Sequence, residues 1–264
     1  MANSQSGESV IRRVAKIVDA FDGSRNGLTV AALARRAGLP LTTAYRMVDE
    51  LTAEGLLERK GAGRLFIGTR LWEVVSRSSP VIGLREAALP HMEDVQVVIG
   101  HHTALGVLDG EEVLYIERLG SRSSTVNITA AAKRLPIHGA SSGLVLLAYS
   151  AAAFQEQVLA RPLAKFTEHT VTDAAQLRRR LADVRRQGYC AMAGIIVPES
   201  SGVAVPVFGP EGNVVAALSV VVPIHGENIP ATVPVLKAAA RGISRALGWQ
   251  GEDAALLRRS LPRP

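Results

Sequence analysis

The sequence predicts two domains: a small, mainly α-helical N-terminal domain and a larger α+β domain with a mostly antiparallel sheet. The length of 264 residues exceeds that of a common single domain. Three short stretches with the apolar spacing of helices stand before Gly55. Later in the chain, helical segments mix with strand pairs that are joined by short turns, which is the pattern of an antiparallel sheet.

The composition is that of a globular protein. Hydrophobic residues make up 47% of the chain and charged residues 20%, which excludes an acidic or low-complexity disordered chain. Most of the formal net charge of +6 is carried by residues 1–79, which favours an anionic partner for that part. The single cysteine, Cys190, excludes an intramolecular disulfide and a cysteine-based zinc site. With no apolar run of membrane-spanning length, we expect a cytoplasmic protein without a membrane partner.

Three amphipathic helices are predicted in the N-terminal domain. Ser9 and Thr29 are candidate N-caps of the first two, and Gly38 suits the left-handed residue that ends the second. Three apolar faces of this size can form the core of a small bundle. The residues at helical spacing are Val14, Ile17, Val18 and Phe21, then Val30, Leu33, Ala34 and Ala37, and finally Ala44, Met47, Val48 and Leu51.

The junction between the second and third helices is short. Gly38 and Pro40 stand in it, a spacing that suits a helix-turn-helix, whose second helix enters the major groove of DNA. Two short strands follow at residues 56–59 and 65–67 around a basic, glycine-bearing turn. Arginines on a helix surface often serve only to solvate it, but the basic hairpin favours a winged helix-turn-helix that reads DNA.

Candidate DNA contacts lie on the outward face of the third helix. Its hydroxyl groups and arginine can reach base edges or phosphates, and the remaining arginines are placed to hold phosphates. The predicted DNA-binding residues are Arg35, Thr42, Thr43, Tyr45, Arg46, Arg59 and Arg64.

In the second domain we expect a helix at residues 84–98 that Pro90 starts or interrupts, and a strand pair around Asp109 and Gly110. A further strand is expected near residues 125–130. Pro206 indicates that its strand is an edge strand or carries a bulge.

Several motifs favour other functions. Residues 139–143, with the sequence GASSG, match the Gly-x-Ser-x-Gly pattern of serine hydrolases, but no later histidine is marked as a base. Adjacent His101 and His102 on a strand point to opposite faces, so we expect no metal site and no cofactor. A hydrolase and a signalling protein that does not bind DNA stay as alternatives.

The order of these segments resembles the IclR family of bacterial transcriptional regulators. In the N-terminal domain the resemblance lies in RRVAKIVDAF, LTVAALARRAGLPLTTAYRMVDELTAEGLLER and RLFIGTRLWEV. In the second it lies in LPIHGASSGLVLLA, VTDAAQLRRRLADVRRQGY and VAVPVFGPEGNVVAALSVVVP, so that nearly the whole chain is covered.

The resemblance implies a GAF-like effector-binding domain, a linker helix that pairs subunits, and a homodimer or homotetramer on a palindromic operator. We expect a repressor rather than an activator, and no enzyme. The predicted boundaries are residues 8–68 for the winged helix-turn-helix, 69–82 for the linker helix, 83–250 for the effector-binding domain and 251–264 for a C-terminal tail.

The pocket implied by the resemblance departs here from the family pattern. Met192 stands where an acidic residue is expected, Gly202 replaces a cysteine, and Val221 replaces one of two serines. An apolar pocket favours a larger ligand such as an aromatic molecule; a small organic acid, or plain core packing, is the alternative. The predicted effector-binding residues are His102, Leu105, Ala140, Ser141, Met192, Val203, Ser219 and Val221.

Overall fold

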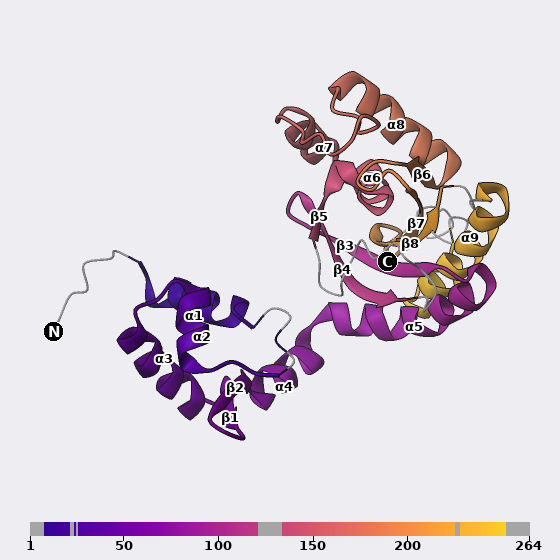
Figure 1. Cartoon of the computed structure of the whole chain (residues 1–264). Helices are drawn as coiled ribbons and strands as arrows, with labels where there is room; N and C mark the ends of the chain where they lie inside the picture. The colour runs from indigo at the N-terminus through magenta and orange to yellow at the C-terminus, as the bar shows by residue number, and fades with distance from the viewer. Residues whose placement is uncertain (1–7, 22–23, 25, 121–133, 225–227, 252–264) are drawn as a thin grey trace, which may run out of the picture. The chain divides into compact units, whose positions relative to one another are not determined.

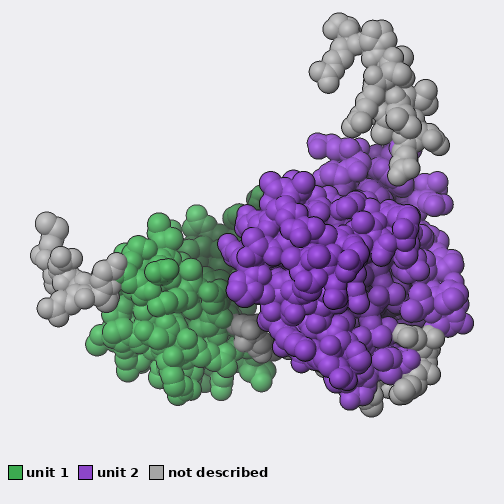
Figure 2. Space-filling model, turned by 90° about the horizontal axis from the view of Figure 1, so that it is seen from above, with its two compact units in different colours: residues 1–82 green, residues 83–264 purple. Residues whose placement is uncertain are grey.

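The chain forms two compact units, residues 1–82 and 83–264 (Figure 1; coloured separately in Figure 2). The structure is a computed structural model that describes residues 8–21, 24, 26–120, 134–224 and 228–251. The strand expected near residues 125–130 lies outside the described residues, and so does the expected C-terminal tail apart from Gly251.

The N-terminal unit contains a three-helix bundle and a hairpin, as predicted. Ser9 and Thr29 accept hydrogen bonds from the first-turn amides of their helices, and Gly38 is left-handed with φ 63°. The apolar face predicted for the first helix included Val18. This side chain is 39% exposed, whereas that of Ile17 is fully buried. The elements are α1 (Val10–Asp19), α2 (Val30–Ala37), α3 (Leu41–Ala53), β1 (Leu57–Lys60) and β2 (Arg64–Ile67).

The hairpin is attached to the bundle through the segment before α2. Leu28 and Leu65 exchange two backbone hydrogen bonds, with N···O distances of 2.9 and 2.7 Å, and both side chains are buried in the helical core. Gly27 has φ 68°, and a Cβ there would come within 2.6 Å of the Phe66 ring. The wing is therefore held at a set position relative to α2 and α3.

Two helices follow the wing. The segment predicted as one linker helix is α4 (Thr69–Ser78), and α5 (Pro80–Ile99) begins two residues later. A proline at the first position of a helix has no amide hydrogen to lose, so Pro80 can start a second helix inside the segment predicted as one linker helix. Pro90 lies inside α5 and neither starts nor ends it. It is exposed, while the opposite face of α5 is buried in the second unit.

The second unit is built on a six-stranded antiparallel sheet with strand order β5-β4-β3-β8-β7-β6, confirming the predicted α+β class (Figure 1). The core on one face is formed with α6, α7 and α8, and the core on the other with α5 and α9. The bounds are β3 (His102–Asp109), β4 (Glu112–Leu119), β5 (Arg134–Pro136), a 3-10 turn η1 (Ile137–Gly139), α6 (Ser141–Ala148), α7 (Ala152–Leu159), α8 (Ala174–Gln187), β6 (Cys190–Ala193), β7 (Ser200–Phe208), β8 (Val214–Pro223) and α9 (Ile229–Ala246).

Pro206 stands where the sheet tolerates a missing donor. β6 pairs with β7 over residues 201–204, so Pro206 lies beyond this pairing, and the register with β8 shifts between Val207 and Phe208. The bulge expected from the proline is thus confirmed, whereas β7 is not an edge strand, because β6 pairs with it over residues 201–204 and is the outermost strand. The amide of Phe208 donates to Ser244 Oγ of α9 at 2.9 Å, which satisfies a backbone group at this edge.

Gly143 generates a first prediction. All residues of α6 are buried, and a Cβ at Gly143 would stand 2.0 Å from the carbonyl oxygen of Ile137, a backbone atom that cannot move alone. Gly143→Ala should lower the free energy of unfolding of the second unit by about 1–3 kcal/mol, the usual effect of overpacking. Urea denaturation followed by circular dichroism measures it.

The matched control is Gly83→Ala. Gly83 is also helical, in α5, but nothing lies within 4 Å of a Cβ placed there. This variant should be neutral or more stable by about 0.5–1 kcal/mol, because alanine favours the helix. Equal stabilities of the two variants would contradict the close approach of α6 to η1.

Candidate functional site

The outward face of α3 is the first candidate site. Its buried residues are Ala44, Met47, Val48 and Leu51, whereas Thr42 and Arg46 are exposed, Tyr45 is 49% exposed and Thr43 is half-buried. The N-cap is Pro40, which makes no side-chain cap hydrogen bond to the first-turn amides. Such amides, together with the partial positive charge of a helix N-terminus, suit an anion such as a phosphate.

The arginines predicted to contact DNA are in different environments. Arg35 and Arg46 are exposed, and Arg46 Nη1 is 4.0 Å from Glu50 Oε1, a loose surface pair. On the wing, Arg59 Nη2 is 2.7 Å from Asp49 Oδ1 of α3, while Arg64 Nη1 donates to the carbonyl oxygen of Gly27 at 3.1 Å. The wing arginines thus also brace the wing against the bundle.

A cavity opens on the α6 face of the sheet. The empty space between its lining residues, with open solvent at the mouth included, is about 530 Å³. Its wall is mostly apolar, with Ile195 and Ile196 added to the residues predicted from sequence. The structure brings together in this wall five of the predicted effector residues: Ala140, Ser141, Met192, Ser219 and Val221.

Three other predicted effector residues lie elsewhere. Leu105 and Val203 are in the core formed with α5 and α9, on the opposite face of the sheet. Their chain neighbours Ala104 and Gly202 line the cavity instead, because adjacent strand residues point to opposite faces. His102 is on the cavity side of β3 but is only 7% exposed, beside Val221 of β8.

Hydroxyl groups supply most of the polarity near the cavity. The Tyr115 and Ser142 hydroxyls are 2.7 Å apart, and burial raises the pKa of Tyr115, so the phenol is neutral. Ser219 Oγ donates to the carbonyl oxygen of Ala104 at 3.3 Å. A Cβ at Gly202 would approach Ser141 Oγ to 2.8 Å, so glycine at this position leaves room for the serine. Tyr115 was not predicted, although it lies on the same face of the β3–β4 pair as Ala104.

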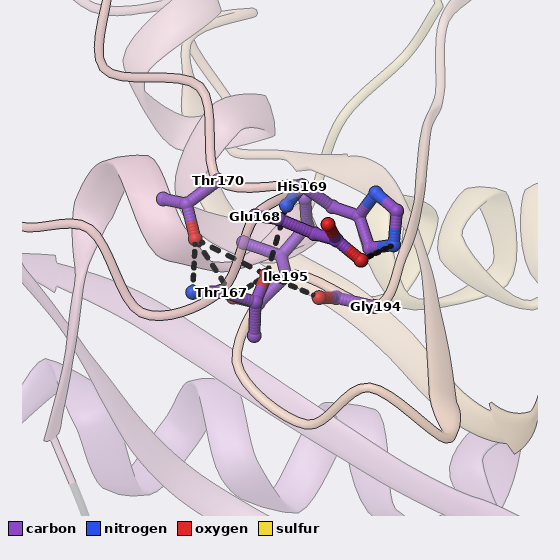
Figure 3. A network of polar contacts seen from close by, with 6 residues as sticks. All are labelled: Thr167, Glu168, His169, Thr170, Gly194 and Ile195. Carbon is purple, nitrogen blue, oxygen red and sulfur yellow. Dashed lines mark hydrogen bonds and ion pairs between the residues drawn. The ribbon is translucent and has the colours of Figure 1, made fainter.

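Two threonines hold the turn that carries the isoleucines of the wall (Figure 3). Thr167 Oγ1 donates to the carbonyl oxygen of Gly194 at 2.6 Å, and Thr170 Oγ1 donates to that of Ile195 at 2.9 Å. Thr170 Oγ1 also accepts from the Thr167 amide at 2.9 Å. The loop after α7 and the turn before β7 therefore form one polar network, which no pattern in the sequence had indicated.

A histidine–arginine pair on β3 and β4 lies on the same face of the sheet as the cavity. Arg118 Nη2 is 3.4 Å from His102 Nδ1. Burial, followed by the charge of Arg118, lowers the pKa of His102, so this imidazole is neutral near pH 7. Within the part of the chain that the structure describes, His102 Nε2 and Arg118 Nε are buried without a hydrogen-bond partner.

The GASSG segment lacks the geometry of a hydrolase. The serine at the nucleophile position of the pattern is Ser141, and the segment before it is a 3-10 turn at residues 137–139, where a nucleophile elbow would have a strand. His138 Nε2 is 2.9 Å from the carbonyl oxygen of Ala164, so this nitrogen is paired with the backbone and not with a serine hydroxyl. Among the described residues, no cluster of His, Cys, Asp and Glu could hold a metal ion. None of the helices described here is long and apolar enough to cross a bilayer.

Comparison with known proteins identifies both domains. Residues 10–61 match the model of the IclR helix-turn-helix domain, and residues 78–245 match that of the bacterial transcriptional regulator IclR C-terminal domain. The regulator RhmR of Escherichia coli is 30% identical over 227 residues, which cover 84% of this chain and 87% of RhmR. XynR of the same organism is 28% identical over 247 residues, covering 90% and 97% of the two chains.

Solved structures of IclR homologs are also similar to this chain. An IclR homolog from Microbacterium hydrocarbonoxydans, complexed with 4-hydroxybenzoate, is 44% identical with a TM-score of 0.84, covering 90% of this chain and 99% of its own. An IclR homolog from a Microbacterium species is 43% identical with a TM-score of 0.60, covering 91% and 98%.

These relatives are transcriptional regulators, of a family that is not enzymatic, and the helix-turn-helix match supports DNA binding. The comparisons give no support to the hydrolase or to the signalling protein that does not bind DNA. The chain belongs to the IclR family of bacterial transcriptional regulators, with an N-terminal DNA-binding domain and a C-terminal effector-binding domain.

Proposed function

We propose that the protein is a repressor that binds a palindromic operator as a homodimer or homotetramer and is controlled by an aromatic carboxylic acid in the cavity of the second unit. One observation carries the choice of ligand: the cavity wall is apolar at Met192, Ile195, Ile196 and Val221. The 44% identical homolog that is complexed with 4-hydroxybenzoate supports the same class of molecule.

The chemistry of the wall favours an aromatic ring over a small hydrophilic acid. Apolar ligand surface that leaves water contributes about 25 cal/mol per Å². The hydroxyls of Ser141, Ser200 and Ser219 stand in the same wall and can accept or donate hydrogen bonds at the edge of a ring. A small aliphatic acid would fill little of this surface.

The DNA interface follows from α3. In a dimer, two copies of α3 would enter successive major grooves about 34–36 Å apart, so the operator would be a palindrome. Contacts to base edges and adjacent phosphates would be made by Thr42, Thr43, Tyr45 and Arg46. Contacts to phosphates would be made by Arg35, Arg59 and Arg64. We base both assignments on the places of these residues on the outward surface. Exposed Trp72, Val74 and Val75 on α4 offer an apolar surface for pairing of subunits.

The effector acts through the difference in its affinity for two arrangements of the protein. It changes operator affinity only as far as it binds one arrangement more tightly than the other. Release of the operator by 4-hydroxybenzoate, measured by fluorescence anisotropy, would support a repressor that the effector inactivates; tighter binding would argue for the opposite direction of control.

The proposed ligand class has a direct test. Thermal unfolding of the whole protein should shift to higher temperature with millimolar 4-hydroxybenzoate and much less with an aliphatic hydroxy acid of similar charge, because a ligand stabilises the state that binds it. Stabilisation by small hydrophilic acids alone would reject an aromatic effector.

Val221→Ala tests the cavity wall. The change removes two carbon atoms, and at about 0.8 kcal/mol for each buried CH₂ it should weaken 4-hydroxybenzoate binding about tenfold in calorimetric titration. Val97→Ala is the control, since Val97 in α5 is 85% exposed. If both variants bind as the unmodified protein does, the ligand does not contact this wall.

Arg46→Ala tests recognition of DNA. The side chain is exposed, so stability should hardly change, whereas loss of a specific contact should weaken operator binding by about 1–3 kcal/mol and relax sequence preference. Electrophoretic mobility shift with operator and scrambled duplexes measures both. Arg178→Ala on α8 is a control at an exposed arginine of the other unit, and equal operator affinity of the two variants would refute the role of Arg46.

Arg35→Ala tests a phosphate contact. Its removal should weaken binding to operator and to scrambled DNA alike, and should reduce the slope of log K against log salt concentration by about 1 if Arg35 neutralises one phosphate. Anisotropy titrations between about 50 and 200 mM salt give this slope, because phosphate contacts are strongly salt-dependent in this range. An unchanged slope would place Arg35 away from the DNA backbone.

A further inference from the structure

We infer that Arg118, assisted by His102, binds the carboxylate of the effector at one end of the cavity. The inference rests on the proposed function, since it takes the effector to be an aromatic carboxylic acid. It goes further by naming the group that recognises the charge, which the apolar wall and the serine hydroxyls do not provide.

The register of the sheet places this pair beside the cavity. Arg118 of β4 is opposite Ala104 of β3, and His102 of β3 is opposite Val221 of β8. Residues directly opposite each other in an antiparallel pair point to the same face. Ala104 and Val221 both line the cavity, so Arg118 and His102 extend its wall sideways.

The pair also holds donors without acceptors. Arg118 Nε always carries a hydrogen, and His102 Nε2 carries one whenever Nδ1 accepts from Arg118. Both nitrogens are buried and have no partner among the described residues. Buried polar groups are nearly always satisfied in native proteins, so orphaned nitrogens on two neighbouring side chains suggest a ligand that supplies acceptors.

The charge of Arg118 is not neutralised by a carboxylate in the described structure. The neighbouring Glu117 pairs with Arg85, 2.5 Å away, and the sequence from residue 120 to residue 133 contains no Asp or Glu. An arginine keeps its charge even when burial lowers its pKa, as it does for Arg118. A planar guanidinium matches the two oxygens of a carboxylate, which a single lysine charge does not.

Recognition of the effector would then be divided between two parts of one site. The ring would lie on the apolar wall near Met192 and Ile195, and the carboxylate would lie toward Arg118 and His102. The neutral imidazole beside the guanidinium avoids the repulsion that a second cation would add, while it can still donate one hydrogen bond.

The test compares an acid with its neutral amide. Calorimetric titrations would use 4-hydroxybenzoate and 4-hydroxybenzamide with the unmodified protein, Arg118→Met, and the control Arg178→Met on the surface of α8. The unmodified protein and the control should prefer the acid by about 10-fold to 100-fold, as expected for hydrogen bonds to a charged group. Arg118→Met should lose this preference and still bind the amide, and His102→Gln should weaken acid binding by a smaller factor.

The outcomes separate the two proposals. If the unmodified protein binds neither compound, the aromatic effector is rejected, and the carboxylate site with it. If it binds the acid and Arg118→Met retains the full preference, the ligand class stands and the role of Arg118 is overturned. Should Arg118→Met fail to fold by circular dichroism, Arg118→Lys replaces it: weaker acid binding with amide binding intact supports the inference, and unchanged acid binding refutes it.

Discussion

The effector-binding unit is organised by the alternation of side chains across one six-stranded antiparallel sheet. On β3, Ala104 faces the cavity and Leu105 faces the core formed with α5 and α9. On β7, Gly202 and Val203 divide in the same way. Each strand therefore serves two functions at once, and a shift of one residue would exchange the ligand-facing side chains with those that hold the helices.

The cavity persists because small residues stand where larger ones would fill it or break the packing around it. A Cβ at Gly202 would touch Ser141, and one at Gly143 would meet the backbone of η1. The opposite side of the cavity is held by hydrogen bonds from Thr167 and Thr170 to the turn that carries Ile195. The space for a ligand is thus maintained on one side by close packing against glycine, and on the other side by the threonine hydrogen bonds.

The DNA-binding unit has one smaller core, and its wing is attached to that core by specific contacts. Its helices bury one narrow face each, and the wing is tied on through Leu28 and Leu65 and through the Arg59–Asp49 ion pair. Exposed ion pairs contribute little to stability, so this pair orients the wing more than it stabilises the unit. The outward face of α3 carries exposed side chains, such as those of Thr42 and Arg46, that do not belong to this core.

Local sequence was enough to predict the N-terminal helices, their caps, the wing, the antiparallel character of the sheet and the bulge near Pro206, because these depend on periodicity and on backbone chemistry. It also pointed to part of the cavity wall. The folded chain was needed to see that Leu105 and Val203 face away from the cavity, that Arg64 is bonded to the Gly27 carbonyl oxygen, and that Arg118 lies beside Ala104. Strand register and contacts between distant residues set these features, and neither is written in the spacing of residues along one segment.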